Sequence, residues 1–268
     1  MTNVVSDRME DFYRDLEGKK MDALWRVRVP GQSGSEPSAP YPPAHWSWSD
    51  IRPFMTRAGV LVAPGPDSER RVVQLIHPAL GAVHSASHSL TANVQMVLPG
   101  EVAPAHRHTI AAIRFIIEGE SAVTIVDGEP VEMRPGDLVL TPAWHWHGHE
   151  NHSNGPTLWM DSLDRPLTVA LRQSRFEQYP KGAQPLVRTP GDSSARFGTG
   201  LLRPASAKES AISPILSYPW METEPALQRL ADVNAIDPFD DVAFDYTNPL
   251  TGGHVLPTIG CRIQMLRP

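Results

Sequence analysis

The chain has 268 residues, of which 41% are hydrophobic, and a formal net charge of −6. This length holds one barrel with large additions or up to two domains. The acidic balance, without a cluster of lysine and arginine, argues against nucleic acid or an anionic membrane as a partner, and no apolar run approaches membrane-spanning length. A single cysteine, Cys261, and a polar N-terminus in place of a signal peptide predict a cytoplasmic protein without disulfides.

The N-terminal part of the chain predicts a helix followed by an arm. Apolar side chains recur with helical spacing from Asp7 to Trp25. The stretch from Gly31 to Pro43 is rich in glycine, serine and proline, which favours an extended arm over a regular element. Trp46 and Trp48 follow, and we expect them to anchor the chain against a barrel or a neighbouring subunit.

The centre of the chain has the pattern of an antiparallel β structure. Arg71 to Ile76 and Leu90 to Leu98 are typical of strands. Val123 to Val126 and Val131 to Met133 flank Asp127-Gly128, which is a strong signal for a tight hairpin turn.

A spaced set of residues in this β region indicates a metal site: Gly100, His106, His108, Gly119, Gly136, Pro142, His147 and Asn151. Because side chains alternate between the faces of a strand, His106 and His108 face the same way, and a returning strand with His147 can complete a three-nitrogen metal face. A lone His-x-His pair would be unspecific, but the full spacing is not. The register of the pattern selects His147 over its neighbours His145, His149 and His152.

This spacing resembles the two signature motifs of the cupin superfamily, small antiparallel barrels with a metal ion inside. Two positions depart from the motifs, since the usual glutamate ligand falls on Ala112 and an inner glycine falls on Trp144. Three histidines without a carboxylate leave a divalent ion its full charge and about three open coordination positions. Such a site suits an anionic substrate that binds through two atoms, together with dioxygen.

A weak internal repeat predicts a second, incomplete barrel. Asn248-Pro249-Leu250 followed by Gln264 to Pro268 echoes His77-Pro78-Ala79 followed by Gln95 to Pro99. We therefore expect an all-β dominated fold, a jelly-roll-like double-stranded β-helix (cupin), with four parts: an N-terminal helix and extended arm at 1–75, the catalytic cupin barrel at 76–170, a connector at 171–215 and the start of an incomplete second cupin at 216–268. The last part either exposes an open edge, which would lower solubility or change association, or docks on the first barrel or a partner subunit.

Longer stretches resemble the gentisate 1,2-dioxygenase family, bicupins that also include salicylate and 1-hydroxy-2-naphthoate dioxygenases. They are Pro99 to Thr109, Arg114 to Glu120, Pro135 to Leu138, Trp144 to His149, Tyr218 to Trp220 and Asn248 to Gly253. The resemblance implies Fe(II) held by His106, His108 and His147 in the complete barrel, and a homotetramer. Thr91 is a departure, because members of the family typically have an aromatic residue there.

Four residues are candidates for substrate binding. On an unbroken strand the even positions from 106 to 116 share one face, so Arg114 projects into the barrel. A buried guanidinium needs an anion, which is either a substrate carboxylate or an acid of the barrel itself. The resemblance assigns catalytic and substrate-binding roles to Arg114 and His149, and substrate binding also to Arg70 and Gln95.

The sequence thus predicts an Fe(II)-dependent extradiol-type dioxygenase that cleaves the ring of a hydroxylated aromatic carboxylate with O2. The favoured reaction is gentisate to maleylpyruvate. Salicylate and 1-hydroxy-2-naphthoate dioxygenases are the alternatives among enzymes, and they differ from the first in not needing a para hydroxyl. A small-molecule-binding cupin without catalytic activity is the alternative from another class.

Overall fold

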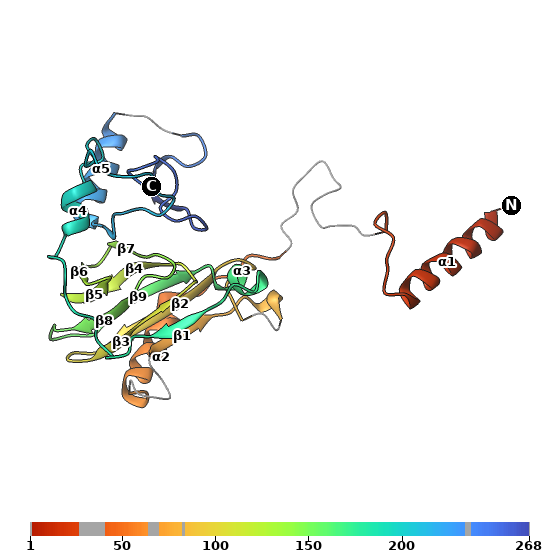
Figure 1. Ribbon diagram of the computed structural model, residues 1–268, viewed down its shortest axis with the longest axis horizontal. Helices are drawn as coiled ribbons and strands as arrows, with labels where there is room; N and C mark the ends of the chain where they lie inside the picture. The colour runs from red at the N-terminus through yellow and green to blue at the C-terminus, as the bar shows by residue number, and fades with distance from the viewer. Residues whose placement is uncertain (1, 27–40, 64–69, 82–83, 234–236, 268) are drawn as a thin grey trace. The chain divides into compact units, whose positions relative to one another are not determined.

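A computed structural model describes residues 2–26, 41–63, 70–81, 84–233 and 237–267 (Figure 1). The contacts divide the chain into two compact units, residues 1–44 and 45–268. Among the described residues, no helix is long and apolar enough to cross a membrane.

The first unit contains the helix α1 (Thr2–Gly18). The helix ends at Gly18 rather than at the expected Trp25, since glycine is a poor helix former and Lys20 adopts a left-handed φ of 59°. Trp25 then folds back, so that its ring stacks on Phe12 at 6.3 Å between centroids and its indole N–H donates to the Tyr13 hydroxyl at 3.1 Å. The arm was expected from Gly31 to Pro43, and most of it, residues 31–40, lies outside the described residues.

The second unit is a barrel of two facing antiparallel sheets. The six-stranded sheet contains, in spatial order, β1 (Arg71–Leu75), β2 (Thr91–Val97), β9 (Thr157–Leu163), β4 (Ala112–Glu118), β7 (Leu138–Thr141) and β11 (Ser217–Tyr218). The five-stranded sheet contains β10 (Phe176–Gln178), β3 (Val102–His108), β8 (His147–Asn151), β5 (Ala122–Val126) and β6 (Glu129–Met133). The predicted all-β dominated, jelly-roll-like fold is therefore confirmed.

The hairpin between β5 and β6 turns at the predicted dipeptide. Asp127 and Gly128 have φ of 44° and 77°, the left-handed conformation that a two-residue turn of this type requires at both positions. Val126 pairs with Glu129 directly across the turn.

The expected unbroken strand from His106 to Ile116 is wrong. β3 ends at His108 and β4 begins at Ala112 in the other sheet, so the chain bends between the two sheets. A hydrogen bond holds the bend: the amide of Ala111 donates to the carboxylate of Asp164 at 2.8 Å. Arg114 still faces the interior, since it shares the inner face of β4 with the buried Ile116.

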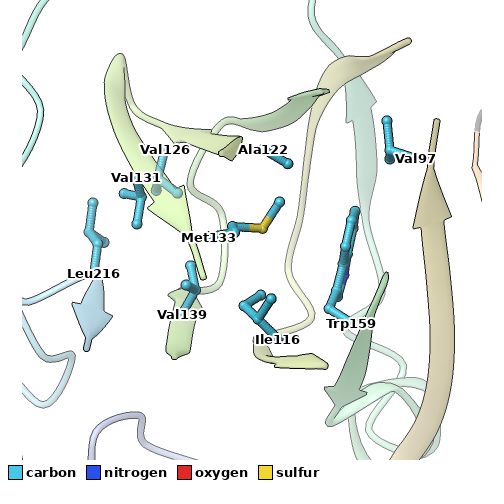
Figure 2. Close-up of a cluster of buried hydrophobic side chains, with 9 residues drawn as sticks. All are labelled: Val97, Ile116, Ala122, Val126, Val131, Met133, Val139, Trp159 and Leu216. Atoms are coloured by element: carbon cyan, nitrogen blue, oxygen red, sulfur yellow. The ribbon is translucent and has the colours of Figure 1, made fainter. Parts of the chain in front are cut away.

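An apolar cluster fills part of the space between the sheets (Figure 2). Its members are Val97, Ile116, Ala122, Val126, Val131, Met133, Val139, Trp159 and Leu216. Because alternate residues of a strand face the same side, residues that pair across the sheet with inward-facing positions also point between the sheets, as His147 does opposite Val126. On β8 those positions are His147, His149 and Asn151, each of which is at most 1% exposed.

Residues 45–75 belong to the barrel unit and include a helix that the sequence reasoning missed, α2 (Trp48–Leu61). Pro53 lies inside this helix, and the side chain of Ser47 caps its start by accepting from the amide of Asp50 at 3.2 Å. Met55 is fully buried against the outer side chains of the six-stranded sheet: Val94, Met96 and Leu158. Trp48 packs on the same cluster, in keeping with its expected role as an anchor.

The connector and the C-terminal part lie along the barrel. They contain the helices α3 (Arg165–Ala170), α4 (Asp192–Phe197) and α5 (Trp220–Asp232) and the paired strands β12 (Val242–Tyr246) and β13 (Cys261–Met265). The short 3-10 helix η1 (Pro78–Leu80) lies earlier in the chain, between β1 and β2. The amide of Val187 donates to the carbonyl of Gly128 at 3.0 Å. Val255, Leu256 and Ile259 pack on the outer face of β7. Residues of the 216–268 segment thus dock on the first barrel.

We predict that Met55→Ala lowers the free energy of unfolding by about 2–5 kcal/mol, because it leaves a cavity between α2 and the sheet. Leu61→Ala, at a position that is 75% exposed on the same helix, is the control and should change stability by less than about 0.5 kcal/mol. Urea denaturation of both variants measures the difference. Equal effects would contradict the packing of α2 on the barrel.

Candidate metal centre and substrate site

Three histidines of the five-stranded sheet form a compact cluster. His106 and His108 come from β3, and His147 comes from β8, where it pairs directly with His106. One ring nitrogen of each lies within 4.8 Å of those of the other two. The ring centroids of His106 and His108 lie 4.6 Å and 4.8 Å from that of His147. The structure therefore brings together the three residues that the sequence pattern selected.

His145, the nearest competitor in the sequence, does not join this cluster. Its Nδ1 hydrogen-bonds to the carbonyl of Ala143 at 2.9 Å, and its Nε2 lies 3.8 Å from the carboxylate of Asp127. The ring is half-exposed, whereas His147 is only 1% exposed.

Burial keeps the imidazoles of the cluster uncharged. It lowers the pKa of His106 to about 2, and the neighbouring guanidinium of Arg70 adds to the shift. Burial also lowers the pKa of His108, and it lowers that of His147 well below the ordinary 6.5. Neutral imidazole is the form that binds metals, so these rings need no proton loss near neutral pH.

Backbone carbonyls orient two of the rings for metal binding. Nδ1 of His108 donates to the carbonyl of Ile110 at 2.7 Å, and Nδ1 of His147 donates to the carbonyl of His145 at 3.0 Å. With the proton on Nδ1, the lone pair of Nε2 is available as a ligand. Three neutral imidazoles fit a first-row transition metal such as iron, zinc, copper or nickel.

A row of polar residues crosses the six-stranded sheet on its inner face. Asn93 of β2 pairs with Asp161 of β9, which in turn pairs with Arg114 of β4. Nε of Arg114 lies 3.2 Å from a carboxylate oxygen of Asp161, and Nη1 donates to Thr141. The internal salt bridge, which was the alternative for Arg114, is thus present. Within the described residues, Nη2 of Arg114 makes no hydrogen bond.

Both partners of this ion pair are strongly buried, with side chains 4% and 8% exposed for Arg114 and Asp161. Burial raises the pKa of Asp161 and lowers that of Arg114. The positive charge of Arg114 also contributes to the lowered pKa values of His106, His108 and His147, so Arg114 acts electrostatically on the histidine cluster.

His149 lies two residues beyond His147 on the same face of β8 and is 1% exposed. Thr124 donates its hydroxyl proton to the sulfur of Met133 at 3.1 Å, and it lies 2.9 Å from Nδ1 of His149. With the hydroxyl proton directed to the sulfur, the oxygen accepts from Nδ1 of His149, and in that tautomer Nε2 is an acceptor. Among the described residues, that Nε2 has no hydrogen-bond partner. Burial lowers the pKa of His149 well below 6.5.

The two remaining candidates also reach this region. Nη2 of Arg70 lies 3.3 Å from Nδ1 and 3.4 Å from Nε2 of His106, and donates to the carbonyl of Pro104 at 3.0 Å. Gln95 is 3% exposed and shares the inner face of β2 with Asn93. In the described part of the chain, its amide nitrogen has no partner.

The sequence reasoning missed Asp161, Asn93 and Thr124. A signal for the first was available, because Asp161 is two residues beyond Trp159 in the same strand and so shares its inward face. Asn93 likewise precedes the candidate Gln95 by two residues.

Comparisons with known proteins identify the family of the chain. Residues 93–163 match the cupin domain family. The chain is 38% identical to gentisate 1,2-dioxygenase 1 of Aquipseudomonas alcaligenes over 98% of its own length and 75% of that protein. It is 39% identical to 5-aminosalicylate 1,2-dioxygenase of a Comamonas species, over 97% of its length and 70% of that protein.

The chain belongs to the gentisate 1,2-dioxygenase family. A crystal structure of salicylate 1,2-dioxygenase from Pseudoaminobacter salicylatoxidans in adducts with gentisate superposes with a TM-score of 0.84 and 34% identity, over 95% of this chain and 71% of that one. The chain is therefore a ring-cleaving dioxygenase of this family, and the predicted relationship is confirmed.

We predict that the metal-free protein loses stability on acidification. Four barrel histidines, His106, His108, His147 and His149, have folded-state pKa values below 6.5. As the pH falls below about 6.5, these histidines bind protons in the unfolded chain but stay neutral in the folded barrel. The free energy of unfolding therefore falls by up to about 1.4 kcal/mol per pH unit for each histidine.

Urea denaturation of metal-stripped protein at several pH values between about 7.5 and 5 measures this slope. His149→Gln should reduce it, whereas His152→Gln, at a side chain that is 65% exposed, should leave it unchanged. A stability independent of pH in this range would contradict the burial of neutral imidazoles.

We predict that His147→Ala weakens metal binding by more than about 100-fold while the barrel remains folded, because a lost ligand affects the site more than the packing. His145→Ala is the matched control and should keep an affinity within about twofold of the original protein. Metal analysis after dialysis, with circular dichroism as the check on folding, measures both. The reverse result would assign the third ligand to His145.

Proposed function

We propose that this dioxygenase binds Fe(II) through His106, His108 and His147 and cleaves the ring of a hydroxylated aromatic carboxylate, with gentisate as the first candidate. The observation that carries this proposal is the convergence of three neutral imidazoles, two guanidinium groups and an imidazole with an available acceptor nitrogen in one barrel interior. Bound Fe(II) would supply adjacent coordination positions for the substrate and O2, and a route for electron density between them.

The two arginines supply the attraction for a carboxylate. Asp161 neutralises Arg114 in the absence of substrate, so the buried charge is tolerated. The Nη2 edge of Arg114 can donate to a substrate carboxylate without breaking the contact of Nε with Asp161. Arg70, beside His106, adds a second positive charge. Together these groups favour an anionic substrate and fix its orientation.

His149 is suited to handle the proton of a ring hydroxyl. Its Nε2 is an acceptor because Nδ1 donates to Thr124, and its low pKa keeps it neutral before the substrate binds. A phenolic proton that moves to Nε2 would leave the more electron-rich phenolate for reaction with oxygen. Since Thr124 stays hydrogen-bonded to Nδ1, the ring keeps its orientation when it becomes charged.

Gentisate is preferred over salicylate and 1-hydroxy-2-naphthoate for two reasons. A protein named gentisate 1,2-dioxygenase 1 covers nearly the whole chain at 38% identity. The inner face of β2 has polar side chains at Thr91, Asn93 and Gln95, which favour a ring with a second polar substituent over a fused hydrocarbon ring. The homotetramer implied by the resemblance remains a prediction, which sizing chromatography with light scattering tests.

We predict oxygen uptake by the Fe(II)-loaded protein with gentisate, and weaker or absent uptake with salicylate and 1-hydroxy-2-naphthoate. An oxygen electrode measures all three rates. Oxygen uptake with salicylate alone would instead assign the protein as a salicylate dioxygenase. A protein that holds iron but takes up no oxygen with any of the three would support a binding cupin without catalytic activity.

We also predict that Arg114→Lys lowers kcat/KM by about 10- to 100-fold with unchanged iron content, because lysine keeps the charge but loses the planar pair of donors. His149→Ala should likewise spare the iron and reduce turnover. Arg107→Lys is the control. The side chain of Arg107 lies on the face of β3 opposite to His106 and His108, and its guanidinium stacks on the rings of Trp144 and Trp146. Unaltered kinetics for Arg114→Lys would show that Arg114 is only a structural partner of Asp161.

A further inference from the structure

Two of the three cluster histidines have the same outer support. Nδ1 of His108 donates to the carbonyl of Ile110 at 2.7 Å. This carbonyl belongs to the peptide group whose amide is that of Ala111, and the Ala111 amide donates to Oδ1 of Asp164 at 2.8 Å. A carboxylate, a peptide group and an imidazole are therefore connected in series.

The same series occurs behind His147. Its Nδ1 donates to the carbonyl of His145 at 3.0 Å. The amide of the same peptide group, that of Trp146, donates to Oδ1 of Asp127 at 2.9 Å. The two series come from different loops, one between β3 and β4 and the other before β8, so their likeness does not follow from one local turn.

This arrangement affects the electron density on the ring. A carboxylate that accepts from a peptide N–H polarises the peptide group and makes its carbonyl oxygen a stronger acceptor. A stronger acceptor at Nδ1–H raises the basicity of Nε2 and fixes the ring in the orientation that a metal requires. Metal-binding histidines commonly donate directly to a carboxylate or to a carbonyl, and here a peptide group joins the two.

The absence of a carboxylate from the cluster makes this support relevant. The position where cupins usually have a glutamate ligand is Ala112, so the three-histidine set itself is uncharged. The guanidinium groups of Arg70 and Arg114 carry positive charge near the cluster, which opposes cation binding. Negative charge delivered through the two peptide groups counteracts this without occupying a coordination position.

We propose that Asp127 and Asp164 are positioning residues that strengthen metal binding by His147 and His108 through the intervening peptide groups. This inference rests on the proposed metal-binding role of the three histidines. Asp164 is well placed for it, because the side chain is buried and its other oxygen accepts from the hydroxyl of Thr258 at 2.6 Å. Asp127 is more exposed and lies in the β5–β6 hairpin turn.

The test replaces each carboxylate by its neutral isostere, which can still accept the hydrogen bond. Asn also suits the turn at Asp127, so Asp127→Asn should fold even if Asp164→Asn does not. The control is Asp137→Asn, because Asp137 accepts from the amides of Arg134 and Trp220 at 3.0 Å and 2.7 Å but connects to no cluster histidine. The full chain of each variant is stripped of metal and titrated with Co(II).

We expect Asp127→Asn and Asp164→Asn each to weaken Co(II) binding by roughly three- to tenfold, less than the loss of a direct partner of a ligand histidine, and to shift the visible absorption bands of bound Co(II). Asp137→Asn should leave both affinity and spectrum unchanged. If Asp127→Asn and Asp164→Asn lose only thermal stability and keep the Co(II) affinity and spectrum of the original chain, the proposal is overturned. An equal loss of affinity in Asp137→Asn would also overturn it, since general electrostatics would then explain the effect. If the original chain binds no Co(II), the metal site itself is wrong, which is a separate outcome.

Discussion

The pairing register of β3 with β8 is the constraint on which the site depends. His106 lies directly opposite His147, so the inner faces of these two strands place all three imidazoles together. Because side chains alternate along a strand, a shift of one residue in either strand would turn its histidines out of the barrel. The apolar cluster between the sheets opposes such a shift, since the same alternation buries Val126, Met133 and Trp159.

Burial in that interior decides the chemistry of the imidazoles. Water is excluded, so the charged form of each ring is unfavourable and the neutral form, which binds metals, is present near neutral pH. The same burial would make a lone guanidinium costly, and the ion pair of Arg114 with Asp161 offsets that cost. The interior can therefore hold both a cation site and an anion site within one barrel.

The elements outside the barrel contribute to the site through hydrogen bonds as well as packing. The C-terminal part covers the outer face of β7 and also provides Thr258, whose hydroxyl donates to Asp164. Asp164 in turn accepts from the amide of Ala111 and so holds the bend between β3 and β4. The same bend contains Ile110, to whose carbonyl His108 donates. The orientation of His108 in the first barrel thus depends, through Asp164, on a residue from the region that was predicted to begin a second one.

Sequence patterns were sufficient for the cupin fold, the Asp127-Gly128 hairpin and the three cluster histidines. The hairpin follows from the backbone demands of its turn, and the common face of His106 and His108 follows from the two-residue period of a strand. The cupin fold and the choice of His147 followed from the resemblance to the cupin motifs. Tertiary structure decided the rest. Helix α2 was missed because Pro53 interrupts its pattern and its stability comes from burying Met55 on the sheet. The partner of Arg114 could not be named from the sequence, since Asp161 is 47 positions away and meets it only through the pairing of β4 with β9. The bend after His108 had the same origin, in a hydrogen bond to the distant Asp164.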